Sequence, residues 1–156
     1  MYLRDNDFSG EIPTELAGVM TLRRVDLRDN DLTGEIPGGF GDIDRLRYLM
    51  LSDNGLSGAI PAGLGNAANM NLLYLANNAL TGEIPVELGN MTTLRRLQLH
   101  NNMLTGDVPA ELGNLTELRN LSLSGNMLTG CIPAAVIDAA VDADHAGLMA
   151  CADDGS

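Results

Sequence analysis

The chain repeats itself every 24 residues, and this period constrains its fold more than any other feature of the sequence. Leu, Asn, Gly and Pro each recur at that spacing through six units. A unit this short cannot bury its own apolar side chains, so successive units must stack around a shared core. The recurring residues are Leu at 3, 27, 51, 75, 99 and 123, Asn at 6, 30, 54, 78, 102 and 126, Gly at 10, 34, 58, 82, 106 and 130, and Pro at 13, 37, 61, 85, 109 and 133.

Each unit contains a short stretch in which apolar and polar side chains alternate. Val25 and Leu27, for example, are separated by the charged Asp26. A period of two is typical of a strand with one buried face. The apolar residues that follow this stretch do not alternate, which indicates a coil that turns around the core. Strands from successive coils would then pair in parallel, about 4.8 Å apart.

The full unit from Leu94 to Glu117 reads LRRLQLHNNMLTGDVPAELGNLTE. It resembles the plant-type leucine-rich repeat, whose pattern is LxxLxLxxNxLtGxIPxxLgxLxx, and the resemblance runs from Met1 to Ile137. The resemblance implies an α/β repeat fold, namely a right-handed leucine-rich-repeat solenoid with a parallel β-sheet on the concave face and a short C-terminal capping helix. We expect a repeat array over residues 1–133, without an N-terminal cap, and a C-terminal cap and tail over residues 134–156.

The recurring polar residues are predicted to be structural. The Asn column points inward in such a coil, and a buried amide is costly unless it is hydrogen-bonded, so these side chains should bond backbone groups left unpaired at the turn. Gly suits the turn or a close approach between coils, and Pro suits a coil edge. A regular Ser/Thr column could indicate ice binding, but its neighbouring columns vary, so we interpret it as part of the repeat consensus. This column comprises Ser9, Thr33, Ser57, Thr81, Thr105 and Thr129.

The two ends of the array are predicted to differ. Met1 already occupies a strand-core position, so the chain begins within a repeat. Met1 and Leu3 would then lie on an open edge strand, through which the protein could self-associate. After Pro133 the pattern stops, and the Ala-rich segment 134–141 favours a short amphipathic helix that covers the last coil.

The two Cys residues lie close together near the C-terminus. In a secreted protein they would form one disulfide, and in a cytosolic protein they would be two free thiols. Cys151 follows the cap segment at a distance that lets it return to Cys131, which favours the disulfide. Metal binding and redox chemistry are poorer explanations, because the pair has neither a CxxC spacing nor a nearby His pair. We therefore expect an extracellular or cell-surface location, although this segment shows no signal peptide.

The charge balance and the missing motifs argue against several function classes. The chain has 21 acidic residues against nine Arg and no Lys, for a net charge of -12. Nucleic acids and anionic membranes are therefore poor partners, and no apolar run approaches the roughly 20 residues that span a bilayer. The only His residues are His100 and His145, and no catalytic or cofactor motif is present. We predict that the chain is not an enzyme and needs no cofactor.

The variable outward positions of the strands are the candidate binding face. Tyr, Met and Leu side chains meet there in the middle coils with Arg around them, and Tyr and Arg are enriched at interaction hot spots. The alternative is that these residues only reflect strand propensity. We predict a non-catalytic ligand-recognition module that binds a protein or peptide through the concave strand face. The candidate ligand-binding residues are Arg24, Tyr48, Met50, Leu72, Tyr74, Arg96, Gln98 and His100.

An acidic column lies beside the Asn column. Asp5, Asp29 and Asp53 stack one per coil, and oxygen-rich loops are the chemistry that Ca²⁺ prefers. Solvated turn residues are the simpler interpretation, so these carboxylates are only a candidate calcium site and no other metal site is predicted. The alternative function that follows from them is a structural or adhesive cell-surface repeat element that depends on calcium.

Overall fold

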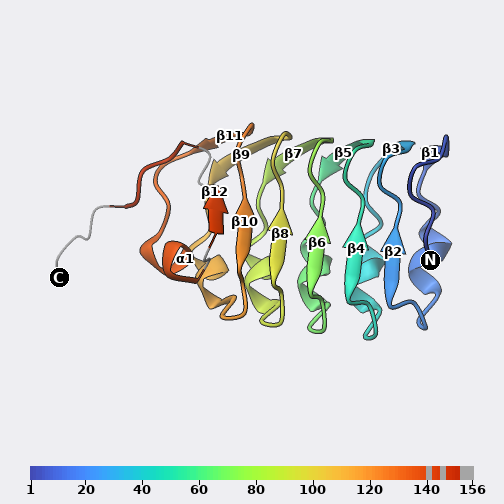
Figure 1. The fold of residues 1–156 in the computed structure, drawn as a ribbon, viewed down its shortest axis with the longest axis horizontal. Helices are drawn as coiled ribbons and strands as arrows, with labels where there is room; N and C mark the ends of the chain where they lie inside the picture. Colours follow the sequence, from blue (N-terminus) through green and yellow to red (C-terminus); the bar gives the residue numbers. More distant parts are fainter. Residues whose placement is uncertain (140–141, 145–146, 152–156) are drawn as a thin grey trace.

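The computed structural model describes residues 1–139, 142–144 and 147–151 of the 156-residue chain. Two six-stranded parallel sheets run side by side along a solenoid, and each repeat contributes one coil (Figure 1). This arrangement confirms the predicted solenoid of parallel strands. Among the described residues, no helix is both long and apolar enough to cross a membrane.

The front sheet, which faces the viewer in Figure 1, contains the strands that the alternating pattern predicts. Its order is β12-β10-β8-β6-β4-β2, so each coil lies beside the next one in the sequence. Its register follows the repeat, with Tyr48 opposite Leu72 and Leu72 opposite Arg96. Its strands are β2 (Arg24–Asp26), β4 (Tyr48–Met50), β6 (Leu72–Tyr74), β8 (Arg96–Gln98), β10 (Asn120–Ser122) and β12 (Asp142–Asp144).

A second sheet, which the sequence did not predict, follows the front sheet around each coil. A glycine interrupts the pattern within most of its strands. Gly34 has a φ of 75°, in the left-handed region where glycine carries no Cβ penalty. The strands are β1 (Ser9–Glu11), β3 (Asp31–Gly34), β5 (Gly55–Ala59), β7 (Ala79–Glu83), β9 (Met103–Asp107) and β11 (Met127–Thr129).

Each of five coils then returns through a 3-10 helix that begins directly after the repeated Pro. Pro61, for example, has a φ of -66° and lacks the N–H group that a helix start would leave unpaired. The helices of successive coils pack closely along the solenoid. A Cβ atom added to Gly65 would collide with the backbone of Glu87 in the next coil, so this position requires glycine. The 3-10 helices are η1 (Thr14–Gly18), η2 (Gly38–Asp42), η3 (Ala62–Asn66), η4 (Val86–Asn90) and η5 (Ala110–Asn114).

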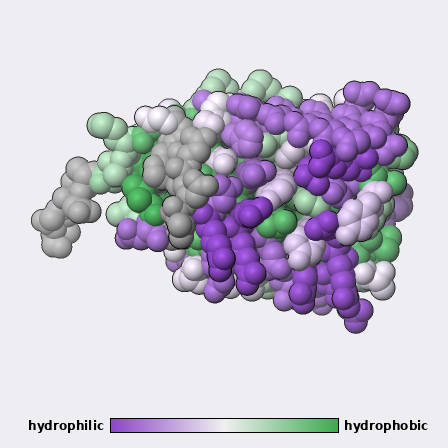
Figure 2. Space-filling model, in the orientation of Figure 1, coloured by the Kyte–Doolittle hydropathy of each residue, from purple (hydrophilic) through white to green (hydrophobic). Residues whose placement is uncertain are grey.

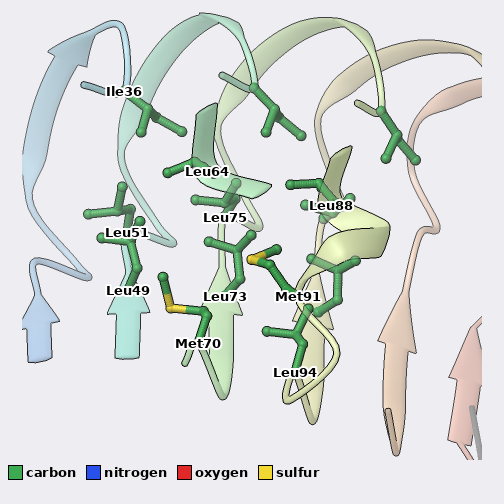
Figure 3. Close-up of a cluster of buried hydrophobic side chains, with 14 of the residues drawn as sticks. Ile36, Leu49, Leu51, Leu64, Met70, Leu73, Leu75, Leu88, Met91 and Leu94 are labelled. Carbon is green, nitrogen blue, oxygen red and sulfur yellow. The ribbon is translucent and has the colours of Figure 1, made fainter. Parts of the chain in front are cut away.

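One continuous aliphatic core fills the interior of the solenoid (Figure 3). Leu49 and Leu73 enter it from the front sheet, Leu64 enters it from η3, and Met70 fills the space below them, all with no exposed side-chain surface. Burying a side chain of this size stabilises a fold by about 1.5–3 kcal/mol. Because each coil packs on its two neighbours, the core is shared along the whole array.

The Asn column has the structural role that the sequence predicts. The Nδ2 group of Asn102 donates to the carbonyl oxygens of Leu75 and Leu99 at 3.0 Å, and its Oδ1 accepts the backbone N–H of Leu80 at 3.1 Å. Leu75 and Leu99 directly follow β6 and β8, and Leu80 lies in β7, so the side chain bridges the end of the front strands and the second sheet. The same pattern is formed by Asn30, Asn54, Asn78 and Asn126.

The C-terminal segment covers the last coil with a helix and a strand. Helix α1 (Ala134–Ala139) packs against η5 and buries Val136 completely. The helix was predicted over 134–141, and residues 140 and 141 lie outside the described residues, as does His145. Strand β12 pairs with β10 and extends the front sheet, which the sequence did not predict.

A disulfide joins the two cysteines beneath this cap. Cys131 and Cys151 are bonded at 2.01 Å, as expected, and their Cα atoms lie 4.9 Å apart. The backbone of Ile132 accepts a hydrogen bond from Cys151 and donates one to Met149, each at 2.9 Å. The disulfide and these hydrogen bonds therefore hold residues 147–151 against the end of the array.

The opposite end of the described array presents apolar side chains. Met1 and Leu3 are half-buried, and they line an opening of about 510 Å³ together with Phe8 and Leu16. Their position agrees with the predicted strand-core placement of Met1, and Met1 and Leu3 pack against the core. Self-association through this edge stays a prediction.

Candidate ligand-binding face

Three columns of outward side chains run along the front sheet, because alternate residues of each strand point away from the core. The 24-residue register places equivalent residues of successive coils side by side. The first column is Arg24, Tyr48, Leu72, Arg96 and Asn120; the second is Tyr2, Asp26, Met50, Tyr74, Gln98 and Ser122; the third is Arg4, Arg28, Ser52, Ala76, His100 and Ser124.

The predicted apolar cluster is assembled on this face, but two of its four outward side chains are buried. Met50 and Tyr74 are only 3% and 9% exposed, although neither belongs to the aliphatic core. Strands in a sheet lie about 4.8 Å apart, so large side chains on neighbouring strands cover one another. Tyr48 and Leu72 are half-buried and form the apolar part of this face that a ligand can reach.

Arg24 is held between two aromatic rings. Its guanidinium carbon lies 4.6 Å from the ring centre of Tyr48 and 5.1 Å from that of Tyr2. Cation–π contacts of this kind attract the guanidinium to the negative ring faces. The contact with Tyr48 fixes a positive charge directly beside the accessible apolar surface.

The next coils carry a second ordered cation and two polar side chains. Arg96 is exposed and donates to the phenolic oxygen of Tyr74 at 3.3 Å, and this hydrogen bond raises the pKa of Arg96 above its usual value. Gln98 and His100 are half-buried rather than fully exposed. Within the described part of the chain, Nδ1 of His100 is buried without a hydrogen-bond partner.

A charged pair occupies the second and third columns of the face at β2. Asp26 is 3% exposed, and both of its carboxylate oxygens accept 2.8 Å hydrogen bonds from the guanidinium of Arg28. The bidentate geometry is strong and directional. The hydrogen bonds from Arg28 hold the pKa of Asp26 below its ordinary value, whereas burial acts in the opposite direction. The carboxylate is therefore ionised at neutral pH and serves to position Arg28.

A groove of about 550 Å³ lies beside the first column, where the chain enters the front strands. Tyr48 is the only lining residue that the sequence analysis selected. The overlooked signal is a second column at repeat spacing, in which Arg occurs at 23, 47, 95 and 119. The remaining lining residues are Arg47, Asn69, Asn71, Thr93, Arg95 and Glu117.

The acidic column is explained by backbone conformation. Asp5, Asp29 and Asp53 have φ values of 58°, 55° and 59°, in the left-handed region that Asp, Asn and Gly tolerate best. The column continues as Asn77, Asn101 and Gly125, which share this conformation.

The carboxylates of this column also have protein partners. Nε of Arg4 lies 3.0 Å from a carboxylate oxygen of both Asp5 and Asp29, and Asp53 accepts a 2.7 Å hydrogen bond from Asn77. In the part of the chain that the structure describes, no group of three or more acidic, His or Cys side chains is arranged to hold a metal ion. The geometry does not favour the candidate calcium site.

The Ser/Thr column of the second sheet does not form a continuous hydroxyl surface. The pairing register is offset from the repeat, so Thr81 lies opposite Ala59 and Met103 rather than opposite another Thr. Acidic residues interleave with the hydroxyls, and the hydroxyl of Thr129 donates to the carboxylate of Asp107 at 2.8 Å. This arrangement agrees with the interpretation that the column belongs to the repeat consensus.

Comparison with known protein families shows to which family the chain belongs. The family model described as Leucine Rich Repeat matches residues 21–43, 45–67, 69–91, 93–115 and 117–138. The chain belongs to the leucine-rich-repeat family. No curated protein sequence matched this leucine-rich-repeat protein.

Several solved structures share its fold. It is 42% identical, with a TM-score of 0.85 over 86% of its length, to part of the ectodomain of the Arabidopsis thaliana receptor kinase GASSHO1/SCHENGEN3, solved with CASPARIAN STRIP INTEGRITY FACTOR 2. It is 39% identical, with a TM-score of 0.80 over 88% of its length, to the Arabidopsis receptor kinase HAESA, solved with the peptide hormone IDA and a co-receptor. It is 31% identical, with a TM-score of 0.88 over 94% of its length, to a plant ice-binding protein. It covers 16%, 24% and 48% of those chains, respectively.

Proposed function

We propose that this leucine-rich-repeat protein is a non-catalytic recognition module that binds a protein or peptide through the outer face of its front sheet. The observation that carries the proposal is the accessible apolar surface of Tyr48 and Leu72, which lies between Arg24 and Arg96 in one column. Aromatic and Arg side chains that can be desolvated together supply most of the binding energy in many interfaces. The face is also preorganised, because the two Arg side chains are held by Tyr rings or hydroxyls.

The similar structures support a peptide-class ligand. Two of the receptor ectodomains were solved with bound partners, and the partner of HAESA is a peptide hormone. The chain matches only a fraction of each ectodomain, so the partner of this protein is inferred from its own face. Parallel strands with variable outward positions can present a different side chain on every coil. Such a surface is suited to recognise an extended ligand.

An extracellular or cell-surface location follows from the same proposal. The bond between Cys131 and Cys151 persists most readily outside the reducing cytosol. The similar solved structures include the ectodomain of a plant membrane receptor kinase. Both observations support a location in which the front face meets secreted ligands.

We do not propose ice binding for this protein on the basis of its similarity to the plant ice-binding protein. The hydroxyls of the second sheet are staggered and interleaved with carboxylates, as Thr105 lies opposite Glu83 and Met127. The carboxylates beside the hydroxyl column hold ordinary hydration water, so the second sheet offers no flat apolar–hydroxyl surface.

The proposal is tested with an immobilised protein and a displayed library of random peptides. We expect selected peptides to lose about tenfold or more in affinity when Tyr48 and Leu72 are both changed to Ala, because truncating a desolvated anchor typically costs over about 1–2 kcal/mol. The matched control changes Val86 and Glu87 to Ala, since both are exposed on η4 on another side of the coil. Capture that survives the Tyr48/Leu72 change, but is lost when Glu35, Glu83 and Asp107 become Ala, would place binding on the second sheet and contradict the proposal.

A further inference from the structure

The positive charge of this acidic protein is concentrated at one edge of the front sheet. The segments 21–24, 45–48, 69–72, 93–96 and 117–120 occupy equivalent positions where the chain enters the strands. They contain seven of the nine Arg and one of the 21 acidic residues, Glu117. These segments therefore carry a formal charge of +6, whereas the rest of the chain carries -18, and Asp44 lies at the same edge beside Arg23, Arg45 and Arg47. Figure 2 shows strongly hydrophilic side chains along the lower margin of this face.

The Arg side chains of this edge are aligned by the backbone. The N–H of Arg47 donates to the carbonyl of Arg23, and that of Asn71 donates to the carbonyl of Arg47. The ladder continues through Arg95 to Arg119, so these residues form one row across successive coils. In the described residues, one Arg of this edge has an acidic side chain within 4 Å, namely Arg95, and its contact with Glu117 is a long 3.8 Å.

The groove of about 550 Å³ runs along this row between Arg47 and Arg95. Its floor is fixed by side chains that bond the backbone of neighbouring coils. Asn71 donates to the carbonyl of Thr93 at 3.1 Å, and the hydroxyl of Thr93 lies 2.9 Å from the carbonyl of Met70. The groove is therefore formed before any ligand binds, and the Arg47 and Arg95 side chains that line it are exposed.

We propose that this groove binds an acidic peptide segment, whose carboxylates pair with Arg47 and Arg95 while an apolar side chain packs on Tyr48. The inference rests on the proposed function and names the chemistry of its ligand. Arg pairs with carboxylates in a bidentate geometry, and Arg clusters recognise acidic motifs in other proteins. Two coils separate Arg47 from Arg95, a distance of about 10 Å that three residues of an extended peptide span.

A short acidic peptide fits this surface better than a long polyanion. The remaining -18 charge would repel a nucleic acid or an anionic polysaccharide wherever it left the groove. A polysaccharide would also stack its sugar rings on exposed aromatic faces. Among the described residues that line the groove, Tyr48 alone is aromatic, and Arg24 lies 4.6 Å from its ring centre, so a single ring face is open to a ligand.

The test selects peptides from a random displayed library and measures their affinity for three forms of the full chain. We expect the selected peptides to be enriched in Asp and Glu, and their affinity to fall as salt rises. The double variant Arg47→Gln/Arg95→Gln should weaken them by about tenfold or more. The control variant Ala62→Glu/Ala110→Glu changes the net charge by the same amount at exposed positions of η3 and η5, and should weaken them less than about threefold.

Four results would overturn the inference, and the first three separate it from the proposed function. Selected peptides that are neutral and need Tyr48 and Leu72, but not Arg47 and Arg95, would leave the proposed function intact and remove the acidic ligand. Equal losses in the charge-matched variants would show that only net charge acts. Preferential capture of polygalacturonate, lost in Arg47→Gln/Arg95→Gln, would assign the groove to a polysaccharide. A library that yields no binder of the front face would contradict both proposals.

Discussion

The side-chain amide of Asn102 donates a 3.0 Å hydrogen bond to the carbonyl oxygen of Leu75, which belongs to the preceding coil. One polar side chain thus joins two coils at the turn where the sheet ladder ends. The same side chain also accepts the N–H of Leu80, so both the donor and the acceptor capacity of the amide are used. Stacking in this protein therefore depends on directional hydrogen bonds as well as on the aliphatic core.

Replacing Asn102 with Ala should lower the free energy of unfolding by about 1–3 kcal/mol, because buried backbone groups lose their partners. Urea denaturation followed by circular dichroism measures this loss. Glu87→Ala, at an exposed position of η4, should change the free energy by less than about 0.5 kcal/mol. Equal losses in the two variants would contradict the role assigned to the Asn column.

The acidic column and its continuation through Asn77 and Asn101 give a prediction about backbone conformation, because these residues share a left-handed φ. Asn77 has a φ of 55°, which costs a β-branched side chain about 1–2 kcal/mol but costs glycine almost nothing. We expect Asn77→Val to be less stable than Asn77→Gly by about that amount. Both variants lose the same side-chain hydrogen bonds, so the comparison isolates conformation. Thermal melting that ranks Val above Gly would show that the backbone does not select this column.

Calcium should not stabilise the protein through its acidic column. Asp5 and Asp29 already share Arg4, and the described residues contain no cluster arranged for a metal ion. The melting temperature in calcium chloride should therefore equal that in sodium chloride of matched ionic strength. A rise that is specific to calcium, and that disappears in Asp29→Asn, would restore the calcium-dependent alternative.

The repeat made the core of the fold predictable, because its columns identify buried positions directly. Leucines such as Leu51 and Leu75 recur at the period of a stacked coil, and the inward Asn residues have one plausible set of partners. The second sheet was missed because Gly34 and its equivalents interrupt any alternation. Strand β12 was missed because residues 142–144 lie outside the repeat and pair with β10 only through the tertiary arrangement.

The binding face was predicted in position but not in accessibility. Sequence alternation shows that Met50 and Tyr74 point outward, and the register confirms that they are neighbours. Their burial depends on how large side chains on adjacent strands cover one another. The alternation of apolar and polar residues within a single strand does not reveal that coverage. The row that contains Arg47 and Arg95 is visible in the sequence. The groove that these residues line forms only when the coils pack, so the sequence did not identify it as a binding site.

The disulfide should stabilise the C-terminal end of the array locally. A bond that closes a loop of 20 residues contributes about 3 kcal/mol in the chain-entropy model. Changing both Cys131 and Cys151 to Ser should therefore lower stability, with hydrogen exchange rising first in α1 and at Ile132. The amides of β4 and β6 should exchange as in the parent protein. Two alkylatable thiols in the native parent would contradict the bond itself.

The pair of Asp26 and Arg28 should make stability depend on pH in the acid range. Because the folded-state pKa of Asp26 is lowered by the Arg28 hydrogen bonds, its contribution is fully present above the ordinary carboxylate value, about 3.9. It is lost as pH falls through the lower, folded-state pKa. The stability difference between the parent and Asp26→Asn should thus be constant from pH 7 to about pH 5 and shrink below about pH 4. Asp31→Asn, at an exposed position, is the control and should follow the parent curve. Parallel curves for the parent and Asp26→Asn down to pH 2 would show that the paired carboxylate has no lowered pKa.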